Sequence, residues 1–462
     1  MTFAIIGAGF SGLGVAAAFR RHGIDYEQLE AADAIGGNWH HGVYETVHII
    51  SSRKTTEYGD FPMPSSWPDF PSARQMLEYL NAYADHHDLR GGIRLSTKVT
   101  RVEPVDVEAG TWKVSWERAN GERGERIYDG VVVCNGHHWS SRMPEYPGAF
   151  GGELIHSKSY KSPEQLAGKR VLVIGGGNSA CDIAVEAARF ARSAHISMRR
   201  GYWFLPKTFL GVPLVELMQP WMPAFAQRAV ARVMARVAVG PYERYGLQHP
   251  DHRPFDRHPT INSELLYYLR HGEIAPHPDI ERWDGRTVRF VDGHEEEIDL
   301  VIAATGFDVR FPFLADGVVA WEDGYPQLIG GLVPPDHKNI YFFGLGQPRY
   351  GAGPLITAGA DLLCEAVATQ RRLEVPLGAV LARLGSRPPR TWLQDPFAVL
   401  RQVRLGKRLM PRLPAIAPLI MGARGRRRGP RAPAAATGVD ASFRAPSRRA
   451  IGGDASAREG IR

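Results

Sequence analysis

The chain has 462 residues, which is too long for a single hydrophobic core and predicts two or three domains. Its hydrophobic content of 44% and charged content of 23% are those of a globular protein, and no run of about 20 apolar residues predicts a membrane span. The three cysteines lie far apart, which argues against a C-x-x-C redox or zinc site, so we expect a reducing, cytoplasmic compartment.

The net charge of +7 comes from one segment. Residues 421–462 hold ten arginines and three acidic residues, so the rest of the chain is close to neutral. This segment is rich in Gly, Ala and Pro and poor in large apolar residues, which predicts a disordered tail. A solvated tail is favoured over an arm for nucleic acid or a membrane surface, because only Phe443 could stack on a base.

The N-terminal residues predict a buried strand and a dinucleotide-binding turn, not a signal peptide. Apolar residues 3–6 precede Gly7, Gly9 and Gly12, which have G-x-G-x-x-G spacing, with Ser11 inside the turn. The three glycines allow a sharp turn, close approach to a pyrophosphate and tight packing of helix on strand. A helix ending near Gly23 should follow.

The second strand, residues 24–30, closes with Glu30, where an acidic residue is expected to accept a ribose hydroxyl. A carboxylate there would repel a 2′-phosphate, so this unit is predicted to bind FAD or NAD and not NADP.

A second unit begins with the apolar strand 171–174. Gly175, Gly177 and Ala180 follow in G-x-G-x-x-A spacing, then a helix and a strand that ends in Arg199 and Arg200. Guanidinium groups at this position can pair with a 2′-phosphate, so NADPH is predicted over NADH; an ordinary solvated strand end is the weaker alternative. The first unit ends in an acidic residue and the second in two arginines. This difference predicts that one unit binds a flavin and the other binds a separate hydride donor.

Between the units, Phe150, Gly152, His156 and Tyr160 fit the pattern F-x-G-x-x-x-H-x-x-x-[YF]. This run resembles the fingerprint of flavin-containing monooxygenases, which are class B flavoprotein monooxygenases. The resemblance implies that the strip links the flavin and NADPH domains and couples cofactor movement to catalysis. It covers about residues 1–370.

Other motifs agree with the resemblance and imply further cofactor contacts. "GGNWH" resembles a flavin-contacting turn, "GNSACD" an NADPH-loop helix start, and "AATG" the strand that returns the chain to the flavin domain. The contacts implied by these three motifs come from Gly37, Asn38, Trp39, Gly177, Asn178, Ser179, Thr305 and Gly306. "YGDFPMPSSWPDF" and "NIYFFGLGQP" also resemble family segments.

One position departs from the family. Many members carry an asparagine beside the flavin, a few residues before the D-F-P segment, where this chain has Ile50. Isoleucine cannot donate a hydrogen bond, and His48, Ser51 and Arg53 are the candidate catalytic residues in its place. The alternative is that NADP⁺ itself holds the oxygen intermediate. The departure keeps open an NADPH oxidase or reductase that oxygenates no substrate.

The resemblance implies an NADPH- and FAD-dependent monooxygenase that passes one atom of O2, through a C4a-(hydro)peroxyflavin, to a soft nucleophile such as an amine or sulfide. Lys161 follows Tyr160, where Baeyer–Villiger enzymes usually have Trp, and this favours oxygenation at nitrogen or sulfur. Baeyer–Villiger-type and indole-pyruvate-type reactions are alternatives. The expected partners are a small-molecule substrate and O2, without nucleic acid. No metal site is expected, because adjacent histidines point apart.

The predicted fold is α/β, with two Rossmann-like domains in which the FAD domain is split by an inserted NADPH domain. A helix over 225–239 with arginines on one face is expected within the insert. Core packing is favoured for it over a substrate lid or weak contact with a membrane surface. The expected ranges are 1–160 (FAD, first part), 161–299 (NADPH, with a helical insert at about 205–255), 300–375 (FAD, second part), 376–420 (helical extension) and 421–462 (tail).

Overall fold

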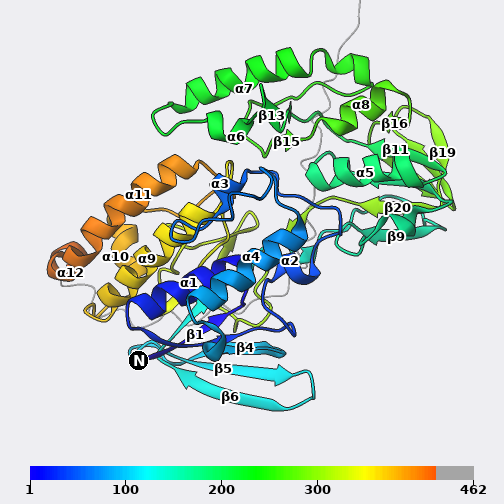
Figure 1. Ribbon diagram of the computed structural model, residues 1–462. Helices are drawn as coiled ribbons and strands as arrows, with labels where there is room; N and C mark the ends of the chain where they lie inside the picture. Colours follow the sequence, from blue (N-terminus) through cyan, green and yellow to red (C-terminus); the bar gives the residue numbers. More distant parts are fainter. Residues whose placement is uncertain (423–462) are drawn as a thin grey trace, which may run out of the picture. The chain divides into compact units, whose positions relative to one another are not determined.

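The computed structural model describes residues 1–422, so all but the first two residues of the predicted tail lie outside it. Two parallel five-stranded sheets organise these residues, and the predicted α/β class is confirmed (Figure 1). The first sheet has the order β24 (Ile340–Phe342), β7 (Gly130–Val133), β1 (Thr2–Ile6), β2 (Asp25–Leu29) and β3 (Ile93–Arg94). The second has the order β16 (Ile274–His277), β11 (Ser193–Ser197), β10 (Arg170–Ile174), β20 (Leu300–Ala303) and β9 (Glu153–His156).

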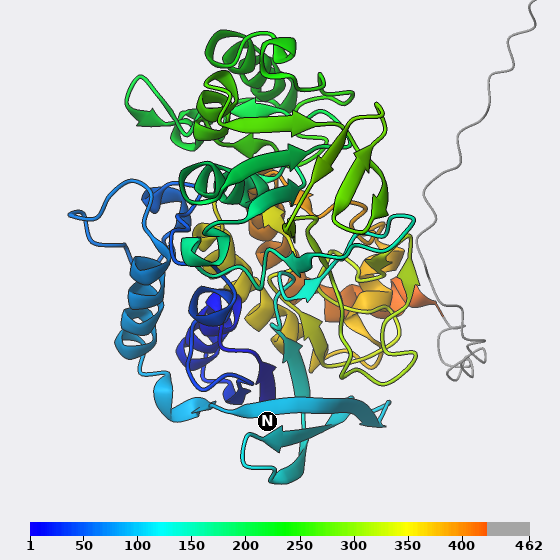
Figure 2. The same ribbon diagram turned by 90° about the vertical axis from the view of Figure 1, so that its right-hand side faces the viewer.

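Both faces of the first sheet are covered, which explains why β1 and β7 are continuous apolar runs. On one face lie α1 (Phe10–Arg21), α4 (Ala73–His86) and α9 (Gly353–Gln370), which pack around one core. An antiparallel sheet covers the other face (Figure 2). Its residues Trp112 and Tyr128 pack against Ile6 and Val133. That sheet consists of β4 (Thr97–Asp106), β5 (Thr111–Arg118) and β6 (Arg123–Tyr128).

The second sheet is covered in the same way. Helices α5 (Asn178–Phe190) and α8 (Glu264–Arg270) share a core with one face. On the other face, Trp283 and Phe290 pack against Leu172 and Val301. These aromatic residues belong to an antiparallel sheet of β17 (Ile280–Asp284), β18 (Thr287–Phe290) and β19 (Glu295–Glu297).

Strand pairing crosses two of the expected domain limits. Strand β9 lies within the expected first flavin segment and β20 within the expected second one, yet both belong to the sheet of the second nucleotide unit. The chain returns to the first unit after β20, through β21 (Phe307–Asp308), which pairs with β8 (Ser140–Ser141). Because β9 is a four-residue edge strand, its segment shows no hydrophobic period in the sequence.

The insert contains the predicted helix, found as α7 (Ala224–Ala238). Its buried residues Ala231, Met234 and Ala235 pack against Leu205 and Leu214, while its arginines Arg232 and Arg236 are exposed. This packing agrees with the core interpretation. The other elements of the insert are β12 (Phe204–Leu205), β13 (Thr208–Phe209), β14 (Val212–Pro213), α6 (Leu214–Leu217), η3 (Tyr242–Tyr245) and β15 (Thr260–Ile261).

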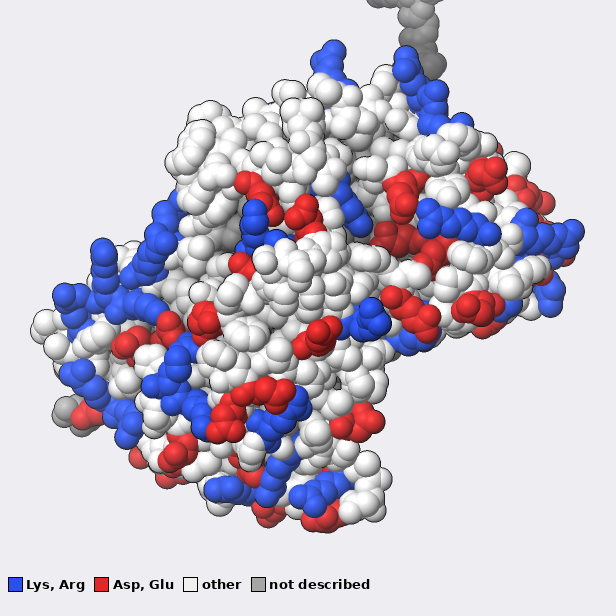
Figure 3. Space-filling model, in the orientation of Figure 1, with Lys and Arg blue, Asp and Glu red and all other residues white. Residues whose placement is uncertain are grey.

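The expected helical extension consists of α10 (Leu377–Arg383), α11 (Pro396–Leu409), η4 (Met410–Arg412) and α12 (Leu413–Met421), with α11 packed along α9. No helix within residues 1–422 is long and apolar enough to cross a membrane. Acidic and basic side chains are interspersed on the face shown in Figure 3. The remaining short elements are α2 (Asn38–His41), α3 (Arg53–Thr56), η1 (Arg90–Gly92), η2 (Pro163–Leu166), β22 (Trp321–Glu322), β23 (Tyr325–Pro326), β25 (Gln347–Pro348) and β26 (Leu393–Gln394).

Candidate functional site

The first loop joins β1 to α1 with glycines at its two tightest points. Gly7 has φ +101°, and a Cβ there would lie 2.7 Å from the carbonyl oxygen of Cys134. A Cβ on Gly12 would lie 2.0 Å from the carbonyl oxygen of Gly7. Helix α1 begins after Gly9, which offers no side-chain cap, so its first amides are available to an anion.

Glu30 follows β2 and holds this loop. One carboxylate oxygen accepts the amide of Ala8 at 2.6 Å and the other accepts the amide of Ala32 at 2.9 Å. The side chain is buried, so these charge-assisted hydrogen bonds fix a negative charge beside the loop.

Two distant turns close onto the first loop. Gly37 has φ +55°, and a Cβ there would lie 2.9 Å from Cα of Gly9, so the turn that continues into Asn38 and Trp39 lies against the loop. Gly344 has φ +83°, and its Cβ would lie 2.1 Å from the hydroxyl of Ser11. These contacts explain the glycines of the "GGNWH" and "FGLGQP" segments by close approach of the backbone.

The second loop joins β10 to α5. Gly175 has φ +130°, and a Cβ there would lie 2.6 Å from the carbonyl oxygen of Ala304. Helix α5 begins after Gly177 without a side-chain cap, and no atom lies within 4 Å of a Cβ built on that glycine. Asn178 accepts the amide of Ile261 at 2.8 Å, and Ser179 is half-buried beside it.

Arg199 and Arg200 lie two and three residues beyond the end of β11. The Arg199 side chain is exposed, and the Arg200 guanidinium carbon lies 5.4 Å from the ring centre of Tyr202. Nε of Arg200 is buried without a hydrogen-bond partner, and neither arginine forms an ion pair within residues 1–422. Both positive charges are therefore uncompensated at this strand end.

The predicted linker connects the two units through Tyr160. This fully buried phenol donates to the carboxylate of Glu186 on α5, which also accepts the hydroxyl of Thr46 from the first unit. Burial, and then the neighbouring carboxylate, raise the pKa of Tyr160. A parallel link joins the Tyr44 hydroxyl to Asp182 at 2.8 Å, one helical turn earlier.

His156 ends β9 and fixes the turn after β20. Its Nδ1 accepts the amide of Lys158 at 3.1 Å, so Nε2 carries the proton and donates to the carbonyl of Gly306 at 3.0 Å. Burial lowers the pKa of His156, which keeps the ring neutral. Thr305, beside this turn, donates from its hydroxyl to the carbonyl of Arg142.

The start of the linker is a packing contact. The ring of Phe150 lies 5.2 Å from that of Trp283, centre to centre. A Cβ on Gly152 would lie 2.6 Å from the carbonyl oxygen of Asp299 and 2.7 Å from the Phe150 ring. Each residue of the fingerprint thus has a contact. Phe150 packs on Trp283, Gly152 lets the backbone approach Asp299, His156 holds the Gly306 turn, and Tyr160 bonds to Glu186.

The three candidate catalytic residues lie before and at the start of α3. The exposed His48 has its Nδ1 2.8 Å from the carbonyl oxygen of Thr46, and the Ser51 hydroxyl lies 2.6 Å from that of Thr56. Arg53 is half-buried, and its Nε has no hydrogen-bond partner. Within residues 1–422 no hydrogen bond joins any of the three to another, so their catalytic role stays a prediction.

Ile50 lies in an apolar environment between the two units. It packs against Val215, Met218 and Ile261 of the insert and against Tyr350. The hydroxyl of Tyr350 donates to Gln227 of α7 at 2.7 Å, which also ties the insert to the first unit. The family's asparagine position is therefore filled by a packed hydrocarbon side chain.

Tyr44 and Thr46 of the first unit meet Asp182 and Glu186 of α5, and these four residues form the junction between the units. The sequence did not predict the two residues on the first unit. Tyr44 and Thr46 belong to no motif, and only their contacts with Asp182 and Glu186 identify them. Asp182 stands in the quoted "GNSACD" motif, which is the one signal that could have pointed to this contact. Burial raises the pKa of Asp182, and its partners Tyr44 and Asn262 satisfy its oxygens.

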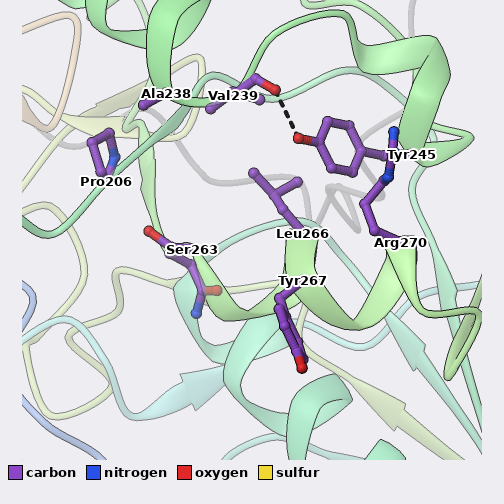
Figure 4. A pocket seen from close by; sticks show the side chains of 9 residues that line it. Pro206, Ala238, Val239, Tyr245, Ser263, Leu266, Tyr267 and Arg270 are labelled. Carbon is purple, nitrogen blue, oxygen red and sulfur yellow. Dashed lines mark hydrogen bonds between the residues drawn. The ribbon is translucent and has the colours of Figure 1, made fainter.

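An open hollow of about 260 Å³ lies in the insert region (Figure 4). Its wall includes the Tyr245 ring, whose hydroxyl donates to the carbonyl of Val239 at 2.7 Å. The side chains that line it are Pro206, Ala238, Val239, Tyr245, Asn262, Ser263, Leu266, Tyr267 and Arg270. None of the predicted site residues is among them.

Comparison with known proteins places this geometry in a family. A family model described as flavin-binding monooxygenase-like matches residues 1–356, which include both loops and the linker. The chain belongs to this family. The predicted enzyme class, a flavin monooxygenase and thus an oxidoreductase, is confirmed at this level.

Two relatives illustrate the similarity in sequence. Human flavin-containing monooxygenase 5 is 33% identical over 378 residues, which cover 76% of this chain and 70% of the human protein. The N-oxide-forming dimethylaniline monooxygenase 2 of Oryctolagus cuniculus is 32% identical over 385 residues, with the same shares covered.

Solved structures show the same fold at lower identity. The S-allyl-L-cysteine S-oxygenase of Allium sativum has a TM-score of 0.64 at 22% identity, covering 90% of this chain and 93% of that chain. The open form of cyclohexanone monooxygenase has a TM-score of 0.68 at 17% identity, covering 90% and 98%. OTEMO in complex with FAD and NADP has a TM-score of 0.62 at 19% identity, covering 80% and 85%.

Proposed function

We propose that this family member is an NADPH- and FAD-dependent monooxygenase that transfers one oxygen atom from O2 to a soft nucleophile, an amine or a sulfide. The observation that carries the proposal is the opposite charge of its two nucleotide loops. Glu30 places a fixed carboxylate at the first loop, whereas Arg199 and Arg200 place two uncompensated guanidinium groups at the second. One chain thus offers separate sites for a flavin and for a phosphorylated nicotinamide.

The residues of the first loop fit FAD. Gly7 and Gly12 let strand and helix approach closely, and the uncapped amides that begin α1 suit a pyrophosphate. Gly37 keeps the neighbouring turn within contact of Gly9 without a side chain between them. Ser11, Glu30, Asn38 and Trp39 would complete this site, together with Thr305 and Gly306.

The residues of the second loop fit NADPH. Gly175 lets the loop turn closely against Ala304, and Gly177 leaves open space before the uncapped start of α5, where Asn178 and Ser179 lie. The unpartnered Nε of Arg200 supplies a donor that a 2′-phosphate would satisfy. Arg199 would add a second charge. The chemistry that the two cofactors supply when bound is hydride transfer and activation of O2.

The chain's own contribution is to position the two sites and to exclude water. Tyr160 and Thr46 meet on one carboxylate of α5, so the helix that begins at the NADPH loop is tied to the flavin unit. Ile50 packs on an apolar cluster of the insert and Tyr350, and this packing would help to exclude water between the two units. A soft nucleophile needs no side chain to activate it, which agrees with the absence of a hydrogen-bonded acid/base pair among His48, Ser51 and Arg53 within residues 1–422.

The name of one relative, an N-oxide-forming monooxygenase, supports nitrogen as the oxygenated atom. The solved structures, an S-oxygenase and a cyclohexanone monooxygenase among them, support the fold alone. Lys161, which replaces the tryptophan expected in Baeyer–Villiger enzymes, donates to the carbonyl of His41 at 2.7 Å. It therefore serves as a bridge between the linker and the flavin unit. The second candidate, an NADPH oxidase without substrate oxygenation, is favoured only by Ile50.

The test is an oxygen balance on the purified flavin-bound protein. NADPH oxidation would be run under isotopically heavy O2 with a panel of amines, sulfides and ketones, measuring product mass and hydrogen peroxide. We expect one heavy oxygen in an N-oxide or S-oxide and little peroxide with a good substrate. Peroxide equal to the NADPH consumed across the whole panel would instead establish an oxidase, and an ester from a ketone would establish Baeyer–Villiger chemistry.

A further inference from the structure

A group of titratable side chains that the proposed reaction does not use lies at one side of the second sheet. His195 comes from β11, His277 is the last residue of β16, and Glu296 lies in the middle of β19. His294 precedes that strand. The group therefore joins the edge of the parallel sheet to the antiparallel sheet that covers it.

The ligand atoms of three of these residues converge. Nδ1 of His195 lies 3.1 Å from Nε2 of His277 and 3.9 Å from Oε1 of Glu296, and all three atoms lie within 4.8 Å of one another. Ligand atoms about 2.0–2.2 Å from a tetrahedral zinc ion stand roughly 3.3–3.5 Å apart. The observed spacing is close to that of a metal-bound set, and only a small shift of Glu296 is needed.

Both imidazoles are buried, with one ring nitrogen of each facing the other. Their residues are 8% and 9% exposed, for His195 and His277 respectively. The two facing ring nitrogens can hydrogen-bond to each other only if one of them carries a proton. A cation between them would instead accept a lone pair from both nitrogens.

The neighbours of these residues hold them as supporting groups do in metal sites. Nε2 of His195, on the far side of its ring, lies 3.1 Å from the hydroxyl of Ser193. The His277 ring stacks on Phe290 with ring centres 4.1 Å apart. Nε2 of His294 lies 2.9 Å from the same Glu296 oxygen and orients that carboxylate.

We propose that His195, His277 and Glu296 form a zinc(II) site with water as the fourth ligand. Two imidazoles and one carboxylate favour zinc over magnesium or calcium, which prefer sites made of oxygen alone. Bound there, the ion would pin β19 to β11 and β16. His277 also accepts the amide of Met198 through its carbonyl at 3.0 Å, so the ion would stabilise the strand end that carries Arg199.

A second group provides an internal comparison. Asp33, His40 and His41 also bring three ligand atoms together, but their side chains are 75%, 25% and 55% exposed. Within residues 1–422 no side chain outside this group hydrogen-bonds to its ligand atoms, and any zinc it takes up should be weakly held.

The experiment uses full-length, tag-free protein freed of metal with a chelator. Zinc(II) would be titrated by calorimetry, and Tm would be followed with and without zinc. We expect one tight equivalent and a higher Tm for the wild type and for the control H40Q/H41Q. We expect at least about tenfold weaker binding and no Tm rise for H277Q and for E296Q, and a smaller loss for S193A. Cobalt(II) should give a tetrahedral visible spectrum in the wild type and in H40Q/H41Q, but not in H277Q or E296Q.

Glu296 is partly exposed, so E296Q should fold even if H277Q does not; circular dichroism and bound flavin would check both variants. The proposal is overturned if the wild type binds no zinc tightly, if E296Q binds it as the wild type does, or if H40Q/H41Q alone abolishes binding.

Discussion

In the first nucleotide unit, the side-chain amide of Gln28 donates to the carbonyl of Gly7 at 2.8 Å; in the second, the hydroxyl of Thr260 donates to the carbonyl of Gly176 at 2.6 Å. Gln28 lies on β2 of the same strand–helix–strand unit, whereas Thr260 lies 84 residues from the glycine it holds. The Gly7 carbonyl of the first loop is therefore held from within its own strand–helix–strand segment. The second loop depends on the insert and, through Asp182 and Glu186, on the other unit.

The sharpest contrast between the loops is at the third motif position, which is Gly12 in one and Ala180 in the other. Gly12→Ala would place Cβ 2.0 Å from the Gly7 carbonyl, so α1 must move away from β1. We expect a loss of more than about 3 kcal/mol, with little flavin-bound protein recovered. The matched change, Ala180→Gly, should cost about 1 kcal/mol from helix propensity and leave flavin bound.

Flavin absorbance per protein and thermal unfolding would measure both variants. If Gly12→Ala kept the flavin content and Tm of the wild type, α1 would not need a glycine in order to pack on β1. The proposed difference between the two loops at the third motif position would then be wrong.

The charges at the strand ends give the next largest expected effect. Replacing Arg199 and Arg200 with alanine should raise KM for NADPH about tenfold to a hundredfold and leave KM for NADH nearly unchanged, because the lost interactions are charge-assisted bonds to a 2′-phosphate. Arg192→Ala removes an exposed arginine just before β11 and should change neither value. Steady-state kinetics with both nucleotides would decide, and an equal rise for the two would remove the phosphate assignment.

The sequence predicted the first unit more completely than the second for a physical reason. Strand, turn, helix and terminal acid all lie within residues 2–30, so spacing alone placed Gly7, Gly12 and Glu30. In the second unit the strand β9 lies before residue 161 and β20 at 300–303, and only pairing with β10 reveals that they share a sheet.

The junction and the histidine cluster could not be predicted, because their members meet only in the fold. Tyr44 is 138 residues from Asp182, and His195 is 82 residues from His277. Spacing along the sequence therefore gives no sign of the cluster of His195, His277 and Glu296, which the strand register assembles. The linker motif was visible, but the roles of His156 and Tyr160 required their partners Gly306 and Glu186.

Glu30→Gln tests whether the first loop needs a charge or only an acceptor. The amide keeps the shape but brings an N–H group towards the amides of Ala8 and Ala32, so the loop should loosen. We expect FAD affinity to fall about tenfold, measured by fluorescence as flavin is released. Glu27→Gln is the matched control, since Glu27 lies on β2, three residues before Glu30, but pairs with Arg94 and not with the loop. Equal affinities for the two variants would show that Glu30 has no role in flavin binding.

The smallest effects are expected at the junction, where the second unit is held by the first. Tyr160→Phe leaves Glu186 with the Thr46 hydroxyl, and Tyr44→Phe leaves Asp182 with Asn262, so each should cost about 1 kcal/mol of unfolding free energy. The two rings lie 5.8 Å apart, and their acceptors are one turn apart on α5. If the junction acts as one unit, the double variant should depart from additivity by more than about 0.5 kcal/mol in denaturant unfolding. Additive losses would mean that the two tyrosines hold α5 independently, and the dependence of the second loop on the first unit would then rest on separate contacts.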